Sequence, residues 1–94
     1  MRMYIWEVAL EVQWKQTWKE GKKEKYEFWE DVKEYTVAAE SGKVAIAKAE
    51  KLALAEGAWT GEHYNDDDTT VPSKETPYKV LDVTGLSLKQ VLDG

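Results

Sequence analysis

The residues best suited to chemistry in this chain are lysines and tryptophans gathered around one predicted turn. Within residues 14–25, five lysines stand against two glutamates, with two tryptophans among them. Lysine ammonium groups attract phosphates and indole rings stack on bases, so this segment could bind a nucleotide or single-stranded nucleic acid. The alternative is structural, because both tryptophans fall on the apolar side of a predicted strand. The residues assigned to phosphate and base binding are Lys15, Trp18, Lys19, Lys22 and Lys23.

A second candidate site combines aromatic and acidic residues in segment 58–77. Trp and Tyr anchor many protein interfaces because they bury a large area with few rotatable bonds, and neighbouring carboxylates would add an electrostatic rim. A tryptophan here could instead fold back over the end of the sheet. The residues assigned to a protein partner are Trp59, Glu62, Tyr64, Asp66, Asp67 and Asp68.

No residue set predicts catalysis, a cofactor or a metal site. His63, the single histidine, could act as a base or ligand beside Glu62 and Asp66, or could be an exposed loop residue. The three adjacent aspartates differ from an EF-hand loop, in which acids alternate. The chain has no cysteine, which excludes thiolate catalysis and cysteine-ligated zinc. We therefore expect a binding protein that is not an enzyme.

The formal net charge of −5 is unevenly distributed along the chain. Residues 62–75 hold five acids against one lysine, a balance of −4, whereas residues 14–25 balance at +3. Net charge therefore does not exclude a nucleic-acid partner. No apolar run is long enough to predict a membrane partner. The N-terminus begins like an export signal, but Glu7 and Glu11 interrupt the uncharged apolar run that such a signal requires. We therefore expect a cytoplasmic protein.

Ninety-four residues predict a single domain over 1–94. Alternating apolar residues predict a first strand over 3–19, followed by a turn at Gly21 and a second strand over 25–38. The apolar parity of the second strand changes between Phe28 and Tyr35. One extra residue would restore a single apolar face, so we expect a bulge near Trp29–Asp31.

The second half of the chain predicts one helix and one further strand. Ser41 is a suitable N-cap, and alanines at 3–4 spacing predict a helix over 42–56. Segment 58–77 lacks periodicity and contains two prolines, which predicts a long acidic loop. A third strand is expected over 78–84, and a short C-terminal turn over 87–92.

These elements predict an α+β fold with the order β–β–α–β. The first two strands form a hairpin, and a right-handed crossover places the third strand beside the first. The expected sheet is three-stranded and antiparallel, in the order 2-1-3, with the helix on one face. The other face carries Met3, Ile5 and Ala9, which the long loop or a second copy in a homodimer could cover.

Residues 36–49, Thr-Val-Ala-Ala-Glu-Ser-Gly-Lys-Val-Ala-Ile-Ala-Lys-Ala, resemble a strand-to-helix junction of small phage-encoded proteins. The resemblance covers residues 3–56 and the last strand, and it implies an accessory phage protein acting in the host cytoplasm. That class is rich in inhibitors of host defence factors. We therefore expect a non-catalytic inhibitor that binds a protein; the alternative is a binder of nucleotides or nucleic acid, including one that sequesters a nucleotide signal.

Overall fold

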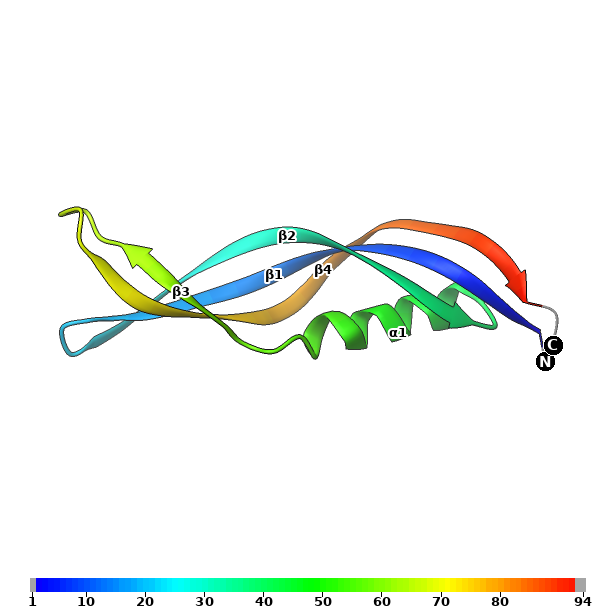
Figure 1. Ribbon diagram of the computed structural model, residues 1–94, viewed down its shortest axis with the longest axis horizontal. Coiled ribbons are helices and arrows are strands. Elements are labelled where there is room, and N and C mark those ends of the chain that lie inside the picture. The colour runs from blue at the N-terminus through cyan, green and yellow to red at the C-terminus, as the bar shows by residue number, and fades with distance from the viewer. Residues whose placement is uncertain (1, 93–94) are drawn as a thin grey trace.

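The length of the molecule is the length of its first strand. In the computed structural model, which describes residues 2–92, β1 (Met3–Glu20) pairs along its whole length with β2 (Lys23–Ala39). Helix α1 (Gly42–Leu54), β3 (Trp59–Tyr64) and β4 (Thr70–Leu92) follow (Figure 1). An 18-residue strand spans roughly 60 Å, in agreement with the longest dimension of 58 Å.

The expected α+β fold with a three-stranded sheet and the order β–β–α–β is wrong. The chain is mostly β, with the order β–β–α–β–β. The sheet has four antiparallel strands in the order β2-β1-β4-β3. The segment expected to be a long loop over 58–77 forms β3, a turn and the beginning of β4, and the strand expected over 78–84 is the middle of β4. The added strand β3 lies at one edge of the sheet, beside β4.

The two prolines that favoured a loop, Pro72 and Pro77, lie in β4 at positions where a strand pairs with β4 on one side and not on both. Pro72 pairs with Glu62 of β3, beyond the last pair between β1 and β4. Pro77 pairs with Trp14 of β1, beyond the end of β3. A proline lacks the N–H that a second neighbour would require, so each is tolerated here as at a sheet edge.

Bulges in β4 explain why the sequence of its C-terminal half lacks the alternation of apolar and polar residues that is typical of a strand. The register with β1 shifts four times, leaving Tyr78, Leu81, Thr84 and Lys89 without a partner. The extra residue at Lys89 brings Leu88 and Val91 to the same side of the sheet despite their spacing of three. The C-terminal turn expected over 87–92 is therefore wrong, because a bulged strand produces the same spacing.

The bulge expected near Trp29–Asp31 is also wrong. The pairing of β2 with β1 is continuous, from Tyr4–Ala39 to Glu20–Lys23. The apolar parity changes because both sides of β2 carry aromatic residues. Trp29 and Tyr35 lie on the side that packs against α1, which we call the helix side, and Tyr26 and Phe28 lie on the opposite, open side.

The core lies between α1 and the helix side of β1. Ser41 caps the helix, and its Oγ accepts a hydrogen bond from the backbone N–H of Val44 at 3.3 Å. Small side chains on the helix allow a close approach to the sheet. The buried apolar residues are Val8, Leu10, Val12, Trp14, Val37, Ala39, Ala45, Ala49 and Ala53.

Helix α1 covers about a third of the sheet, because 13 residues at 1.5 Å each extend about 20 Å. It lies over the half that contains the chain termini (Figure 1). Its last residue is Leu54, two residues before the expected end at 56. Glu56 instead accepts a hydrogen bond from the Tyr35 hydroxyl at 2.8 Å, which ties the end of the helix to β2.

Candidate functional site

The end of the molecule that α1 leaves uncovered is forked. Pairing between β1 and β4 stops at Trp18–Ser73, although β1 continues to Glu20 and β4 begins at Thr70. Beyond that pair the β1–β2 hairpin and the β3–β4 hairpin separate into two arms, at the left of Figure 1. We call residues 14–29 and 59–77 together the forked end.

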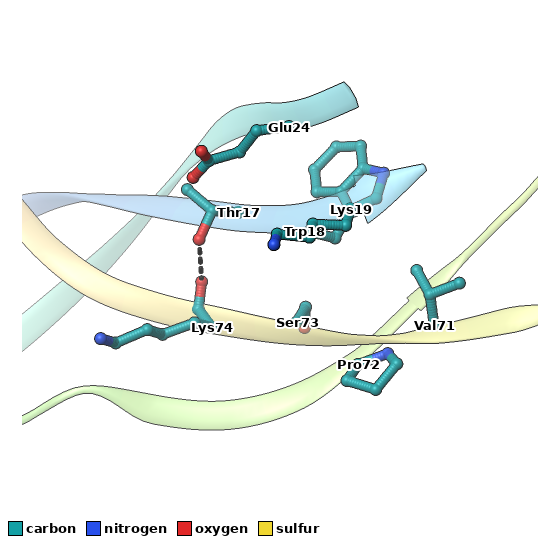
Figure 2. A pocket seen from close by; sticks show the side chains of 8 residues that line it. All are labelled: Thr17, Trp18, Lys19, Glu24, Val71, Pro72, Ser73 and Lys74. Atoms are coloured by element: carbon teal, nitrogen blue, oxygen red, sulfur yellow. Dashed lines mark hydrogen bonds between the residues drawn. The ribbon is translucent and has the colours of Figure 1, made fainter. Parts of the chain in front are cut away.

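A pocket of about 490 Å³ lies at the base of the fork. Figure 2 shows its lining side chains, contributed by β1 and β4 with Glu24 from β2. One lining residue, Ser73, accepts a hydrogen bond at its Oγ from Gln16 Nε2 at 3.2 Å, which is a buried polar contact between β4 and β1. The pocket is lined by Thr17, Trp18, Lys19, Glu24, Val71, Pro72, Ser73 and Lys74.

The two arms end in tight turns of opposite charge. The β1–β2 turn contains Gly21 at φ 65°, with lysines at 19, 22 and 23 around it. The β3–β4 turn spans residues 65–69 and is closed by the backbone N–H of Asn65, which donates to the Thr69 carbonyl at 2.8 Å. Asp68 adopts φ 65°, which Asp tolerates better than most residues.

Of the three aspartates in this turn, Asp67 has a structural role. Its carboxylate accepts hydrogen bonds from both the hydroxyl and the backbone N–H of Thr69. These bonds stabilise the charged form and lower the pKa of Asp67. All three aspartates are exposed, so together they carry the negative charge that this arm presents to solvent.

Four of the five tryptophans lie at the forked end on the helix side, and we call Trp14, Trp18, Trp29 and Trp59 the indole row. Trp14 and Trp29 stack with ring centroids 5.4 Å apart and planes 9° from parallel. They line a second pocket of about 150 Å³ together with Lys33, Trp59 and Glu75.

Three of these indoles carry buried N–H groups without an acceptor among the residues that the structure describes: those of Trp14, Trp18 and Trp29. The fifth tryptophan, Trp6, lies near α1, and its Nε1 donates to the Ala39 carbonyl at 3.2 Å. Buried polar groups normally find partners, since leaving one unpaired costs about 1–3 kcal/mol. The unpaired donors therefore gather at the forked end.

The residues predicted to bind a protein partner do not form one surface. Trp59 and His63 of β3 are on the helix side, whereas Glu62 and Tyr64 are on the open side, since side chains alternate along a strand. Trp59 and Tyr64 are 59% and 74% exposed. The aspartates Asp66, Asp67 and Asp68 lie in the turn at the end of the arm.

The residues predicted to bind phosphate and bases are also divided between the two sides. Lys15 lies on the open side, with its Nζ 4.7 Å from the ring centroid of Tyr26. Trp18 lies on the helix side and stacks on His63, with ring centroids 3.6 Å apart and planes 12° from parallel. The lysines Lys19, Lys22 and Lys23 surround the turn of the β1–β2 arm.

An aromatic cluster on the open side was missed by sequence reasoning. Phe28 lies between Tyr26 and Tyr78, with centroid distances of 5.5 and 4.9 Å. The even positions of β2 carry Tyr26 and Phe28, but in the sequence this pattern indicates a change of phase as readily as an aromatic face. Tyr78 reaches this side at a bulge, which no pattern in the sequence indicates.

Within residues 2–92 no group of three or more His, Asp and Glu side chains is placed to hold a metal ion. His63 lies in a strand and stacks on Trp18, in contrast to the exposed loop position considered from the sequence. The helix of the described chain, α1, has 13 residues and is too short and too polar to cross a lipid bilayer.

Comparison of the chain with protein-family models, with curated proteins and with solved structures finds no match.

Proposed function

We propose that this protein is a non-catalytic binding protein that holds an extended segment of a partner protein against the indole row. The observation that carries the proposal is the set of three buried indole N–H groups without acceptors, at Trp14, Trp18 and Trp29. These N–H groups are buried in the unbound protein, so binding must move the side chains that cover them. An extended peptide presents a carbonyl oxygen at every residue, so it could then supply several acceptors in a row.

The surroundings of the indole row suit a peptide. Trp59 is 59% exposed beside the smaller pocket, where it can close over a bound side chain. Lys33 and Glu75 line the same pocket and offer one charge of each sign for orientation. Burial of an exposed tryptophan is a common source of affinity in protein interfaces.

Selection from a displayed library of random peptides tests the proposal and requires no identified partner. We expect the wild-type protein to enrich peptides, and Trp59→Ala to weaken their binding at least about 10-fold. Tyr64→Ala is the matched control, because Tyr64 is exposed on the same strand but on the opposite side. Equal weakening by the two variants would contradict the proposed site.

The indole protons give a second readout. In ¹H–¹⁵N spectra the Nε1–H signals of Trp14, Trp18 and Trp29 should shift on addition of a selected peptide. The signal of Trp6 should stay in place because its N–H already donates to Ala39. Peptide binding that leaves the three signals unmoved would overturn the role of the indole donors.

A second candidate function, binding of single-stranded nucleic acid, is favoured by the contact between Lys15 and Tyr26 on the open side. Exposed aromatic rings beside lysines can stack bases while the ammonium groups pair with phosphates. By register Lys74 and Lys79 lie on the same side as Lys15. A labelled oligonucleotide that shows no binding at low salt would exclude this function, and Tyr26→Leu should abolish any binding by stacking.

The phage origin, the host cytoplasm as compartment and a host defence factor as partner remain predictions from the sequence. Each is compatible with a protein that acts by binding. A selected peptide that matches a segment of a defence protein would be the first direct support for that partner class.

A further inference from the structure

The molecule exposes more surface than a monomer of its mass normally does. A folded chain of 10.8 kDa is expected to expose about 5,500 Å², whereas this chain exposes 6619 Å². Its radius of gyration is 17.6 Å, against about 12 Å for a compact chain of this length. The excess of about 1,100 Å² follows from the elongated shape, which measures 58 × 18 × 16 Å. A standard interface buries roughly 800 Å² of each partner, so the exposed surface is ample for one.

A neutral apolar strip lies at the end opposite the fork. Its residues pair with the buried positions of β1 and therefore lie on the helix side: Val83 with Leu10, Leu86 with Val8, Leu88 with Trp6, and Val91 with Tyr4. They are between 36% and 50% exposed. We call Val83, Leu86, Leu88 and Val91 the β4 strip.

The β4 strip is poor in charge. Charged residues make up 33% of the chain, but Lys89 is the single charged residue within 83–92. Lys89 extends to the other side of the sheet, where its Nζ lies 3.4 Å from Glu7 Oε2. The buried centres of protein interfaces are depleted in charge in the same way.

The backbone of β4 opposes pairing at its free edge and leaves the side chains as the contact surface. From residue 76 to 92, β4 has β1 as its one neighbour within the described chain. All four of its bulges, at Tyr78, Leu81, Thr84 and Lys89, lie in that stretch and interrupt the edge. Bulges disrupt regular addition of another strand, so a partner would pack on the side chains of the strip.

We propose that a second copy of this chain covers the β4 strip, forming a two-fold symmetric dimer. A neutral apolar strip can pack against an identical strip, because apolar contact requires no opposite charge. The forked end is less suited to such a symmetric contact, because its two arms carry opposite charges. The strip supplies the apolar centre of this interface, and the surface around it must supply the rest of the roughly 800 Å² that each copy of a stable dimer buries. The forked ends point away from this interface, so the dimer presents two of them (Figure 1).

Sedimentation equilibrium of the purified protein tests the proposal. We expect a mass that approaches twice 10.8 kDa as the concentration rises, with no dissociation at high salt. Leu88→Glu should weaken the dimer at least about 100-fold, because it places a charge in an apolar interface. Val32→Glu is the matched control, since Val32 is 54% exposed on the open side and Leu88 is 50% exposed on the helix side.

Amide hydrogen exchange of the wild-type protein keeps the test independent of how the variants fold. Amides within 83–92 should exchange more slowly at high protein concentration than at low concentration, and those of residues 59–64 should not change. A wild-type mass of 10.8 kDa at every concentration would overturn the proposal. So would a dimer that salt dissociates, or one that Val32→Glu disrupts and Leu88→Glu does not. The inference does not rest on peptide binding at the fork.

Discussion

The indole of Trp18 in β1 lies flat on the imidazole of His63 in β3, with ring centroids 3.6 Å apart, although β4 separates the two strands. The contact passes over Ser73, which pairs with Trp18 on one side and with Gly61 on the other. Gly61 has no side chain on this path, and an added Cβ would be in ordinary contact with the Ser73 hydroxyl at 3.4 Å. This ring pair holds the two arms of the fork together at their base.

The Trp18–His63 pair should contribute measurably to stability. We expect His63→Ala to lower the free energy of unfolding by about 0.5–1.5 kcal/mol, the usual value of an aromatic pair. Tyr64→Ala should have almost no effect, because Tyr64 is 74% exposed. Urea denaturation followed by tryptophan fluorescence measures both. Equal stabilities for the two variants would contradict a stabilising stack.

The turn of the β1–β2 arm requires a residue that accepts positive φ. Gly21 has φ 65° and open space around the position of an added Cβ, so any cost of substitution comes from the backbone alone. Gly21→Ala should destabilise the protein by about 1 kcal/mol, and Gly21→Asn by less, because Asn tolerates this conformation. Thermal unfolding of the two variants provides the comparison. A Gly21→Asn protein less stable than Gly21→Ala would rule out the backbone explanation.

The acidic arm can be separated into surface charge and turn structure. Replacing both Asp66 and Asp68 by Asn removes exposed charge and should leave the unfolding temperature nearly unchanged. Asp67→Ala removes the acceptor for Thr69 and should lower the unfolding temperature more than the double variant does. If the charge of this arm steers the partner, the double variant should bind selected peptides more slowly with little change in dissociation. Association and dissociation rates equal to those of the wild-type protein would show that the charge of Asp66 and Asp68 does not contribute to peptide binding.

Stability should fall in strongly alkaline solution because of Tyr35. Burial, and then the hydrogen bond and charge of Glu56, raise the pKa of Tyr35 to about 12, against 10.0 for an unperturbed tyrosine. The folded state holds the phenolic proton more tightly than the unfolded state. The resulting stabilisation is therefore complete below pH 10 and is lost as the pH rises to about 12. Tyr35→Phe should lack this loss, and a wild-type curve identical to that of the variant would contradict the prediction.

Glu11 should destabilise the folded protein at neutral pH. On the open side, a hydrogen bond with Glu30, desolvation and the charges of Glu30 and Asp82 raise the pKa of Glu11 above 4.5. A raised pKa means that the folded state favours protonated Glu11, so folding is disfavoured once the pH exceeds that pKa. Glu11→Gln should raise the melting temperature at pH 7 and have no such effect at pH 3.

Glu7→Gln is the control for Glu11→Gln. Glu7 lies four residues away on the same side, but it forms an ion pair with Lys89 at 3.4 Å. Its replacement should leave the melting temperature unchanged or slightly lower it. A gain from Glu7→Gln as large as that from Glu11→Gln would show that the effect comes from net charge alone.

Local patterns were sufficient wherever the chain is regular. The alternation of Tyr4 to Trp18 predicted β1, and the Ser41 cap with spaced alanines predicted the start of α1. In both elements the side chains that pack against the core repeat with the period of the backbone. The residue types also indicated which segments carry exposed aromatic and charged groups.

The fork and the β4 strip depended on non-local pairing. Pro72 and Pro77 lie in a strand because β4 lacks a second neighbour at each of those positions, and four bulges remove the alternation that would identify the rest of β4. A bulge reverses the side on which every later residue lies. The sequence by itself therefore determined which side chains this protein has for binding. The tertiary structure decided which residues of different strands share a surface, because the strand order and register place Trp59 of β3 with Trp14 of β1.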